Sequence, residues 1–171
     1  MLNMVDVFVG LGSNLGDSRH TLKRAWSMLG EQEGIELEKL SNPYVSAPVG
    51  MDSLNWFTNA VGHLKTDLPA HQLLKILLET EQSLVRIRNE GDRGYQDRVV
   101  DLDLLYYGTL IHDDPRLTVP HPHLSQRLFI LEPLASIAPE FIDPERKISA
   151  AALYHLLKSM IDSETIERQE I

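Results

Sequence analysis

The order of apolar segments along the chain constrains the fold more than any other feature of the sequence. A β-branched run that ends before Gly12 predicts a buried strand. The next segment repeats apolar residues at the i, i+3, i+4, i+7 spacing of an amphipathic helix, with Asp17 or Ser18 as its cap. The strands are predicted at Val5 to Leu11, Ile35 to Ser46, Asn59 to Lys65 and Val99 to Tyr107; the helical residues are Leu22, Ala25, Trp26 and Leu29.

A second, longer helix is predicted from Pro69, because proline is favoured in the first helical turn. The resulting order, β-α-β-β-α-β with helical additions, is typical of an α+β sandwich with a mainly antiparallel sheet, of the ferredoxin-like kind. The additions are helices over Ser125 to Ala138 and from about Ser149, followed by a charged tail over 164–171 that we expect to fray. With 171 residues, the chain is expected to form one domain over 1–171.

Composition excludes several classes of function. The sequence has no cysteine, so thiolate catalysis, thiolate metal sites and disulfides are excluded. It contains no run of roughly 20 apolar residues and no signal-peptide pattern at its start, which favours a cytoplasmic location without a membrane role. The formal net charge of −9 disfavours nucleic-acid partners.

Six of the ten arginines nevertheless lie in one central segment; these are Arg86, Arg88, Arg93, Arg98, Arg116 and Arg127. Such a cluster in an acidic protein indicates a small polyanionic ligand such as a nucleotide. Surface ion pairing with the many carboxylates is the alternative interpretation for each arginine.

Asp101 and Asp103 are the strongest candidates for chemistry. Alternation along a strand puts both on one face, with Cα atoms about 7 Å apart and Leu102 on the other face. Two such carboxylates repel each other unless a cation lies between them, and Mg²⁺ in proteins is commonly held by one or two carboxylates with substrate phosphates. A polar strand face in water is the alternative.

Glu81 occupies an unusual place on the long helix. The buried stripe is predicted as Leu74, Leu77, Leu78 and Val85. Glu81 falls on this stripe, so that it either lies at the edge in water or is held there to orient a cation. Both interpretations stay open on the pattern alone.

Two further motifs are less specific. The glycines of Gly10 to Gly16 do not follow the dinucleotide or P-loop spacing, and a tight turn before the helix is favoured. His121 and His123 could contribute to a zinc site, but no third ligand of suitable spacing is apparent, and a neutral histidine that donates to a phosphate is favoured. His63, His71 and His155 show no clustering in the sequence and are interpreted as structural.

Taken together, these segments resemble 6-hydroxymethyl-7,8-dihydropterin pyrophosphokinases of folate biosynthesis. The matching pieces are Gly12-Ser13-Asn14-Leu15, Asn59-Ala60-Val61, Arg98 with Asp101-Leu102-Asp103, Leu117-Thr118-Val119-Pro120-His121, Leu131-Glu132-Pro133-Leu134 and Ile137-Ala138-Pro139-Glu140. Each piece is unspecific, but their order and spacing over about Val7 to Pro144 are specific.

The resemblance implies a ferredoxin-like fold and transfer of the β,γ-diphosphate of ATP to a pterin alcohol, leaving AMP. It implies two Mg²⁺ ions on Asp101 and Asp103, with Arg86 and Arg98 also catalytic. The implied ATP-binding residues are Glu81, Arg86, Arg98, Arg116, Thr118, His121 and Arg127, and the implied pterin slot comprises Ser46, Ala47, Val49, Phe57, Asn59, Tyr95 and Phe129.

The chain departs from the family pattern in the polar loop over 89–97. Many members carry Trp-Gly-Pro-Arg where this chain has Tyr95-Gln96-Asp97-Arg98, so that Tyr95 is assigned in place of the tryptophan and Arg93 in place of a basic loop residue. We expect the loop to close over ATP and pterin in a monomeric enzyme. A phosphotransferase that yields ADP and a non-catalytic nucleotide or pterin sensor are the rival functions.

Overall fold

The computed structural model describes residues 3–14, 16–46, 56–89, 100–161 and 169–170, with side chains except those of residues 86–89 and 169–170. The elements are β1 (Val5–Ser13), α1 (Ser18–Gly30), β2 (Ile35–Leu40), β3 (Tyr44–Ser46), β4 (Phe57–Thr66), α2 (Ala70–Asn89), β5 (Asp101–Tyr107), β6 (His112–Asp114), β7 (Leu117–Val119), a 3₁₀ turn (Leu124–Gln126), α3 (Leu128–Ile137), α4 (Ala150–Met160) and β8 (Gln169–Glu170).

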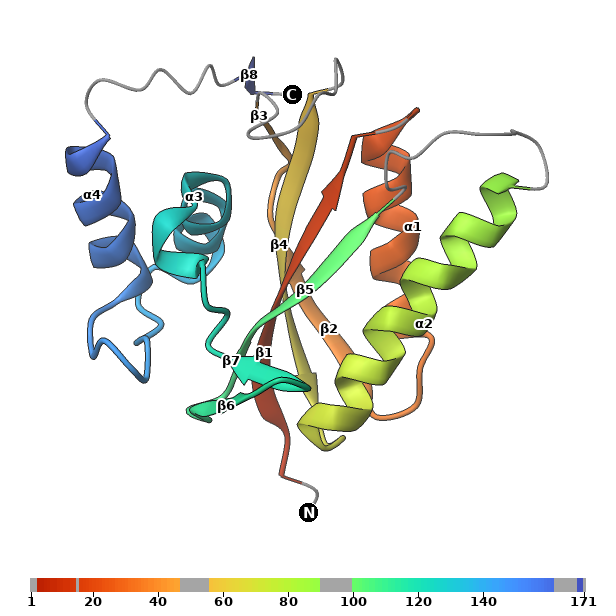
Figure 1. Cartoon of the computed structure of the whole chain (residues 1–171), viewed down its shortest axis with the longest axis horizontal. Coiled ribbons are helices and arrows are strands. Elements are labelled where there is room, and N and C mark those ends of the chain that lie inside the picture. Colours follow the sequence, from red (N-terminus) through yellow and green to blue (C-terminus); the bar gives the residue numbers. More distant parts are fainter. Residues whose placement is uncertain (1–2, 15, 47–55, 90–99, 162–168, 171) are drawn as a thin grey trace.

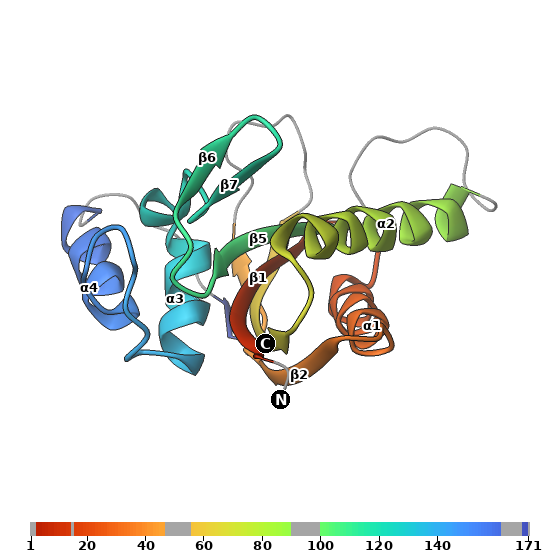
Figure 2. The same cartoon turned by 90° about the horizontal axis from the view of Figure 1, so that it is seen from below.

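The main sheet has the strand order β5-β1-β4-β3-β8, with β2 also paired to β4, and all its pairs are antiparallel. Figure 1 shows α1 and α2 on one face of this sheet and α3 and α4 on the other, and Figure 2 shows the same layers from below. The β6–β7 hairpin forms a separate two-stranded sheet. The predicted α+β, ferredoxin-like arrangement is confirmed.

A hydrophobic core lies on each face of the sheet. The core under α1 and α2 includes Val7, Val9 and Leu11, while Phe8 and Val61 belong to the core under α3 and α4. Alternate residues of β1 therefore enter different cores, as the period of a strand requires. Gly62 allows α1 to approach β4 closely, since a Cβ there would lie 2.3 Å from the Trp26 ring.

The first helix buries the four residues that the sequence predicts, Leu22, Ala25, Trp26 and Leu29, and Asp17 is its N-cap. Asp17 accepts a hydrogen bond from the backbone N–H of His20 at 3.2 Å. Such a cap satisfies one of the amide groups that the first turn leaves without an intrahelical partner.

The predicted single strand over Ile35 to Ser46 is wrong in its continuity, because the structure divides it into β2 and β3. Pro43 lies in the break and has no N–H to donate to a ladder. Ser41 carries the pairing across this break: its N–H donates to the carbonyl of Val61, and its Oγ accepts from the N–H of Val61, both at 2.9 Å.

The predicted buried stripe of α2 is wrong at Leu78 and Val85, which are 48% and 37% exposed. The helix instead buries Ala70, Leu73, Leu77, Thr80 and Leu84, a stripe with the same helical spacing. The helix offers leucines on two neighbouring faces, and packing against α1 and β5 selects between them. Glu81 therefore lies beside the buried stripe rather than on it.

Near the chain end, the structure describes β8, which pairs with Tyr44 and Val45 of β3. The tail expected to fray, 164–171, otherwise lies outside the described residues. Within the described part of the chain, none of the helices has the length and apolar character needed to cross a membrane.

Candidate active site

One row of residues runs across the sheet on the face that α3 covers. Register pairs Asp101 with Gly12, Gly12 with Asn59, and Asn59 with Tyr44. Paired residues of antiparallel strands point to the same face. The row therefore joins a carboxylate proposed for metal binding, on β5, to the amide proposed for pterin binding, on β4, with only β1 between them.

Asp101 and Asp103 alternate with buried leucines, as the sequence predicts. Both aspartates are half-buried, whereas Leu102 and Leu104 are at most 5% exposed in the core under α1 and α2. The strand partner of Asp103 is Gly10, which adds no side chain beside this carboxylate. The donors at this place are carboxylate oxygens, the ligand type that Mg²⁺ prefers, so that the pair fits that ion.

The amide of Asn59 is oriented by its surroundings. Its Nδ2 donates to the Oγ of Ser46 at 3.2 Å, and both residues are 8% exposed. A Cβ on Gly12 would lie 2.9 Å from the Oδ1 of Asn59, so the glycine makes room for this amide. Phe57 is the strand partner of Ser46. The structure thus brings together Ser46, Phe57 and Asn59 from the predicted pterin set.

His121 lies close enough to Asp103 for the carboxylate charge to act on its ring. Burial lowers the pKa of His121; the Asp103 charge opposes this effect, and Arg127 and His123 reinforce it. Its Nδ1 accepts a hydrogen bond from the N–H of His123 at 3.2 Å. Neutral His121 therefore carries its proton on Nε2 and can donate it to an anionic oxygen.

Arg127 and Phe129 form a second pair at the start of α3. The guanidinium carbon of Arg127 lies 5.7 Å from the centre of the Phe129 ring, within the range of a cation–π contact. Both side chains are half-buried. This contact links a candidate for ATP binding to a candidate for the pterin slot.

The β6–β7 hairpin carries Arg116 and Thr118. Arg116 is exposed, and its backbone N–H donates to the Oδ1 of Asp114 at 2.7 Å. The Oγ1 of Thr118 donates to the carbonyl of Asp114 at 3.1 Å. These hydrogen bonds fix the turn that presents the arginine.

Glu81 reaches the outer edge of β5. Its Oε1 accepts a hydrogen bond from the N–H of Leu102 at 2.6 Å. Because Leu102 stands between the two aspartates, Glu81 positions the strand segment that carries them. Glu81 thus lies at the edge of the buried stripe, half-buried, and its hydrogen bond favours the interpretation of an oriented carboxylate.

Several predicted site residues are not tested by the described coordinates. Ala47, Val49, Tyr95 and Arg98 lie outside the described residues. Arg86 belongs to α2, but its side chain also falls outside the described part.

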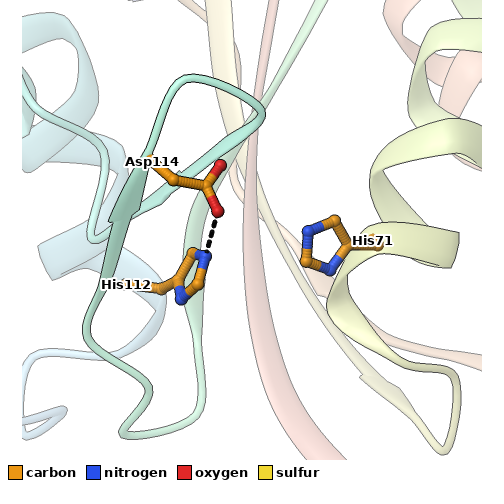
Figure 3. A group of neighbouring side chains, drawn as sticks. All are labelled: His71, His112 and Asp114. Carbon is orange, nitrogen blue, oxygen red and sulfur yellow. Dashed lines mark hydrogen bonds and ion pairs between the residues drawn. The ribbon is translucent and has the colours of Figure 1, made fainter.

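Sequence reasoning missed two features, one inside the proposed site and one away from it. It interpreted Gly12 only as part of a turn, whereas β1 continues to Ser13 and Gly12 lies inside the strand; a glycine within a strand run was the available signal. It also interpreted His71 as unclustered, which is wrong, because His71 lies near His112 and Asp114 (Figure 3). These residues come from distant segments, and their spacing gives no signal.

Carboxylates beside an imidazole and a guanidinium, on the α3 side of an α+β sheet, suit an enzyme that handles metal-bound phosphates. The sequence pattern of the 7,8-dihydro-6-hydroxymethylpterin-pyrophosphokinase family matches residues 8–139. The chain belongs to this family.

Individual relatives agree with the family match. A 2-amino-4-hydroxy-6-hydroxymethyldihydropteridine pyrophosphokinase of Methylorubrum extorquens is 37% identical over 139 residues, which are 81% of this chain and 86% of the relative. The enzyme of the same name from Haemophilus influenzae is 32% identical over 166 residues, or 96% of this chain and 98% of the relative.

A crystal structure of Plasmodium falciparum HPPK-DHPS with pteroate has the same fold, with a TM-score of 0.70 at 14% identity. The match covers 95% of this chain and 44% of that longer chain.

Proposed function

We propose that this chain transfers the β,γ-diphosphate of ATP to the hydroxymethyl group of 6-hydroxymethyl-7,8-dihydropterin, giving AMP and the pterin diphosphate for folate biosynthesis. Family membership supports pyrophosphoryl transfer to this alcohol. The structural observation that carries the proposal is the row from Asp101 through Gly12 to Asn59. The Asp101 carboxylate and the Asn59 amide share one face along this row, which supports a site that binds both a cation and a polar ring.

The pterin is bound through the amide of Asn59. With one donor engaged by Ser46, the Asn59 amide keeps its carbonyl oxygen and a second N–H for the amide edge of the ring. Phe57 and Phe129 supply apolar surface for the ring faces. Ala47, Val49 and Tyr95 complete the slot by their places in the sequence.

Asp101 and Asp103 hold two Mg²⁺ ions together with the phosphates of ATP. The bound ions supply charge neutralisation at the transferring group. Glu81 keeps both carboxylates in place through the N–H of Leu102.

Basic and polar side chains hold the phosphates from the other side. His121 donates from Nε2, and Arg127 adds positive charge beside it. Arg116 and Thr118 approach from the hairpin, and Arg86 and Arg98 are assigned to the transferring charge from their sequence positions. The guanidinium groups stabilise charge that develops as the bond to AMP breaks.

The transfer is a direct in-line displacement. The hydroxymethyl oxygen attacks the β-phosphorus, the bond from this phosphorus to the AMP oxygen breaks, and the hydroxyl proton is released. The residues contribute orientation and charge, with no covalent enzyme intermediate.

We propose further that the enzyme acts as a monomer in the cytoplasm. Light scattering of the purified protein measures its mass in solution, and a mass of twice 19.4 kDa contradicts the monomer. Cell fractionation tests the location.

The deciding experiment separates nucleotide products after incubation with MgATP, with and without the pterin. We expect AMP only with the pterin, and none after chelation of the metal. ADP would assign a different phosphotransferase. Pterin and nucleotide binding without turnover would assign a sensor and overturn the proposal.

A further inference from the structure

A group of three side chains away from the proposed catalytic row has the composition of a metal site. His71 comes from the first turn of α2, and His112 and Asp114 come from β6. One ligand atom from each residue lies within 4.8 Å of those of the other two. Figure 3 shows the three side chains facing the same space between the helix and the hairpin.

The carboxylate of Asp114 is held in a fixed orientation. Its Oδ1 accepts hydrogen bonds from the N–H groups of Arg116, at 2.7 Å, and Leu117, at 3.0 Å. Its Oδ2 is thereby turned toward the ring of His112, whose Nε2 lies 2.6 Å away. Outer hydrogen bonds of this kind orient metal ligands in proteins and tune their basicity.

We propose that His71, His112 and Asp114 form a binding site for a divalent transition metal of the zinc class. Two imidazoles and one carboxylate are a common three-ligand set for Zn²⁺, with water in the fourth position. Ligands about 2.0–2.1 Å from a tetrahedral ion are roughly 3.4 Å apart. A small movement of the three side chains would therefore bring their ligand atoms to the distances that zinc requires. Metal binding would replace the hydrogen bond between the Nε2 of His112 and the Oδ2 of Asp114.

The chemistry of this site differs from that of the aspartate pair. Imidazole nitrogen favours Zn²⁺, Co²⁺, Ni²⁺ and Cu²⁺, whereas Mg²⁺ favours oxygen ligands. Asp101 and Asp103 provide carboxylates, and the new group provides two nitrogens and one carboxylate. The two sites should therefore prefer different metals, Mg²⁺ at the aspartate pair and a zinc-class ion at the new group.

The proposed ion would connect two distant parts of the fold. His71 belongs to the start of α2, while His112 and Asp114 belong to β6, the first strand of the β6–β7 hairpin. A metal bound here cross-links the hairpin to the helix. The dipole at the start of α2 opposes a cation, so that affinity depends on the three ligands.

Untagged, metal-free protein should be dialysed against limiting Zn²⁺, with bound metal measured by elemental analysis. Co²⁺ should be added separately to record its visible absorption. We expect one zinc per chain, the intense bands of tetrahedral cobalt, and a higher unfolding temperature with zinc. His71→Ala and His112→Ala should each weaken zinc binding by at least about tenfold.

His20→Ala and His155→Ala are matched controls, since both histidines are exposed and lie outside the group. His71 is also exposed, and circular dichroism of metal-free His71→Ala shows whether folding is retained. Zinc bound equally by wild type and His71→Ala overturns the proposal. So does zinc that is lost in Asp101→Asn/Asp103→Asn but retained in His71→Ala, or an absence of binding in the wild type.

Discussion

Gly12 and Asn59 are strand partners whose side-chain positions compete for one space: a Cβ on Gly12 would lie 2.9 Å from the Oδ1 of Asn59. The amide cannot move toward Ser46 without disturbing the 3.2 Å hydrogen bond that orients it. The proposed pterin site therefore requires glycine at position 12, because a side chain there would displace the Asn59 amide.

Gly12→Ala should raise the Kd for the pterin by about tenfold or more, because loss of one well-oriented hydrogen bond to a polar ligand costs about 1.5 kcal/mol. Gly10→Ala is the control in the same strand, since its added Cβ would meet the Leu105 side chain at an ordinary 3.4 Å. Fluorescence titration with the pterin measures the Kd of both variants. Equal affinities for the two variants would show that Gly12 does not shape this site.

Glu81 is predicted to act as a positioning residue through the N–H of Leu102. Glu81→Ala removes the acceptor and should lower the free energy of unfolding by about 1.5–3 kcal/mol, the usual range for hydrogen bonds to charged groups. It should also lower kcat, because the strand between Asp101 and Asp103 loses its support. Urea unfolding and steady-state kinetics are the measurements.

Glu81→Gln is the matched variant, since its side-chain oxygen still accepts from the N–H of Leu102. Recovery of most of the stability and kcat supports positioning. If Glu81→Gln were as slow as Glu81→Ala while fully stable, the charge itself would be required.

Local patterns predicted those parts of the fold that one segment determines. The alternation of Asp101, Leu102 and Asp103 fixed which residues share a face, and the first helix buries Leu22, Ala25, Trp26 and Leu29 as predicted. The family resemblance also supplied Asn59, whose orientation depends on Ser46 and Gly12 in other strands.

Features that depend on tertiary contacts were less predictable. Leu78 and Leu73 both fit a helical stripe, and only packing shows that Leu73 is buried. The proximity of His71 to His112 arises because α2 begins beside the β6–β7 hairpin. Periodicity along one segment contains no information on either arrangement.

Asp101→Asn is predicted to separate chemistry from pterin recognition. Removing one carboxylate weakens the hold on Mg²⁺ and should lower kcat by at least about 100-fold, the scale observed when a key electrostatic contact to a transition state is lost. The pterin Kd should change little, since Asn59, Ser46 and Phe57 are unchanged. Initial rates give kcat, and pterin titration gives the Kd.

Glu36→Gln is the control for loss of one negative charge, because Glu36 is exposed on β2. It should retain wild-type kcat. Normal turnover by Asp101→Asn would remove the metal-binding role from Asp101.

His121 is predicted to make stability depend on pH. Burial depresses its pKa in the folded state below the ordinary value of 6.5. As pH falls through 6.5, the unfolded chain therefore binds more protons at this residue than the folded chain does, and the free energy of unfolding decreases. The decrease is complete once the pH lies below the pKa of His121 in the folded state. Above 6.5 both states are neutral, and the contribution is constant.

His121→Asn removes this titration while its Oδ1 can still accept from the N–H of His123. The decrease in the free energy of unfolding between pH 7.5 and about pH 5 should therefore be smaller than in the wild type. Urea unfolding at both pH values gives the difference, with His20→Asn as the exposed control. An unchanged decrease in His121→Asn would mean that His121 has the same pKa in the folded and unfolded states.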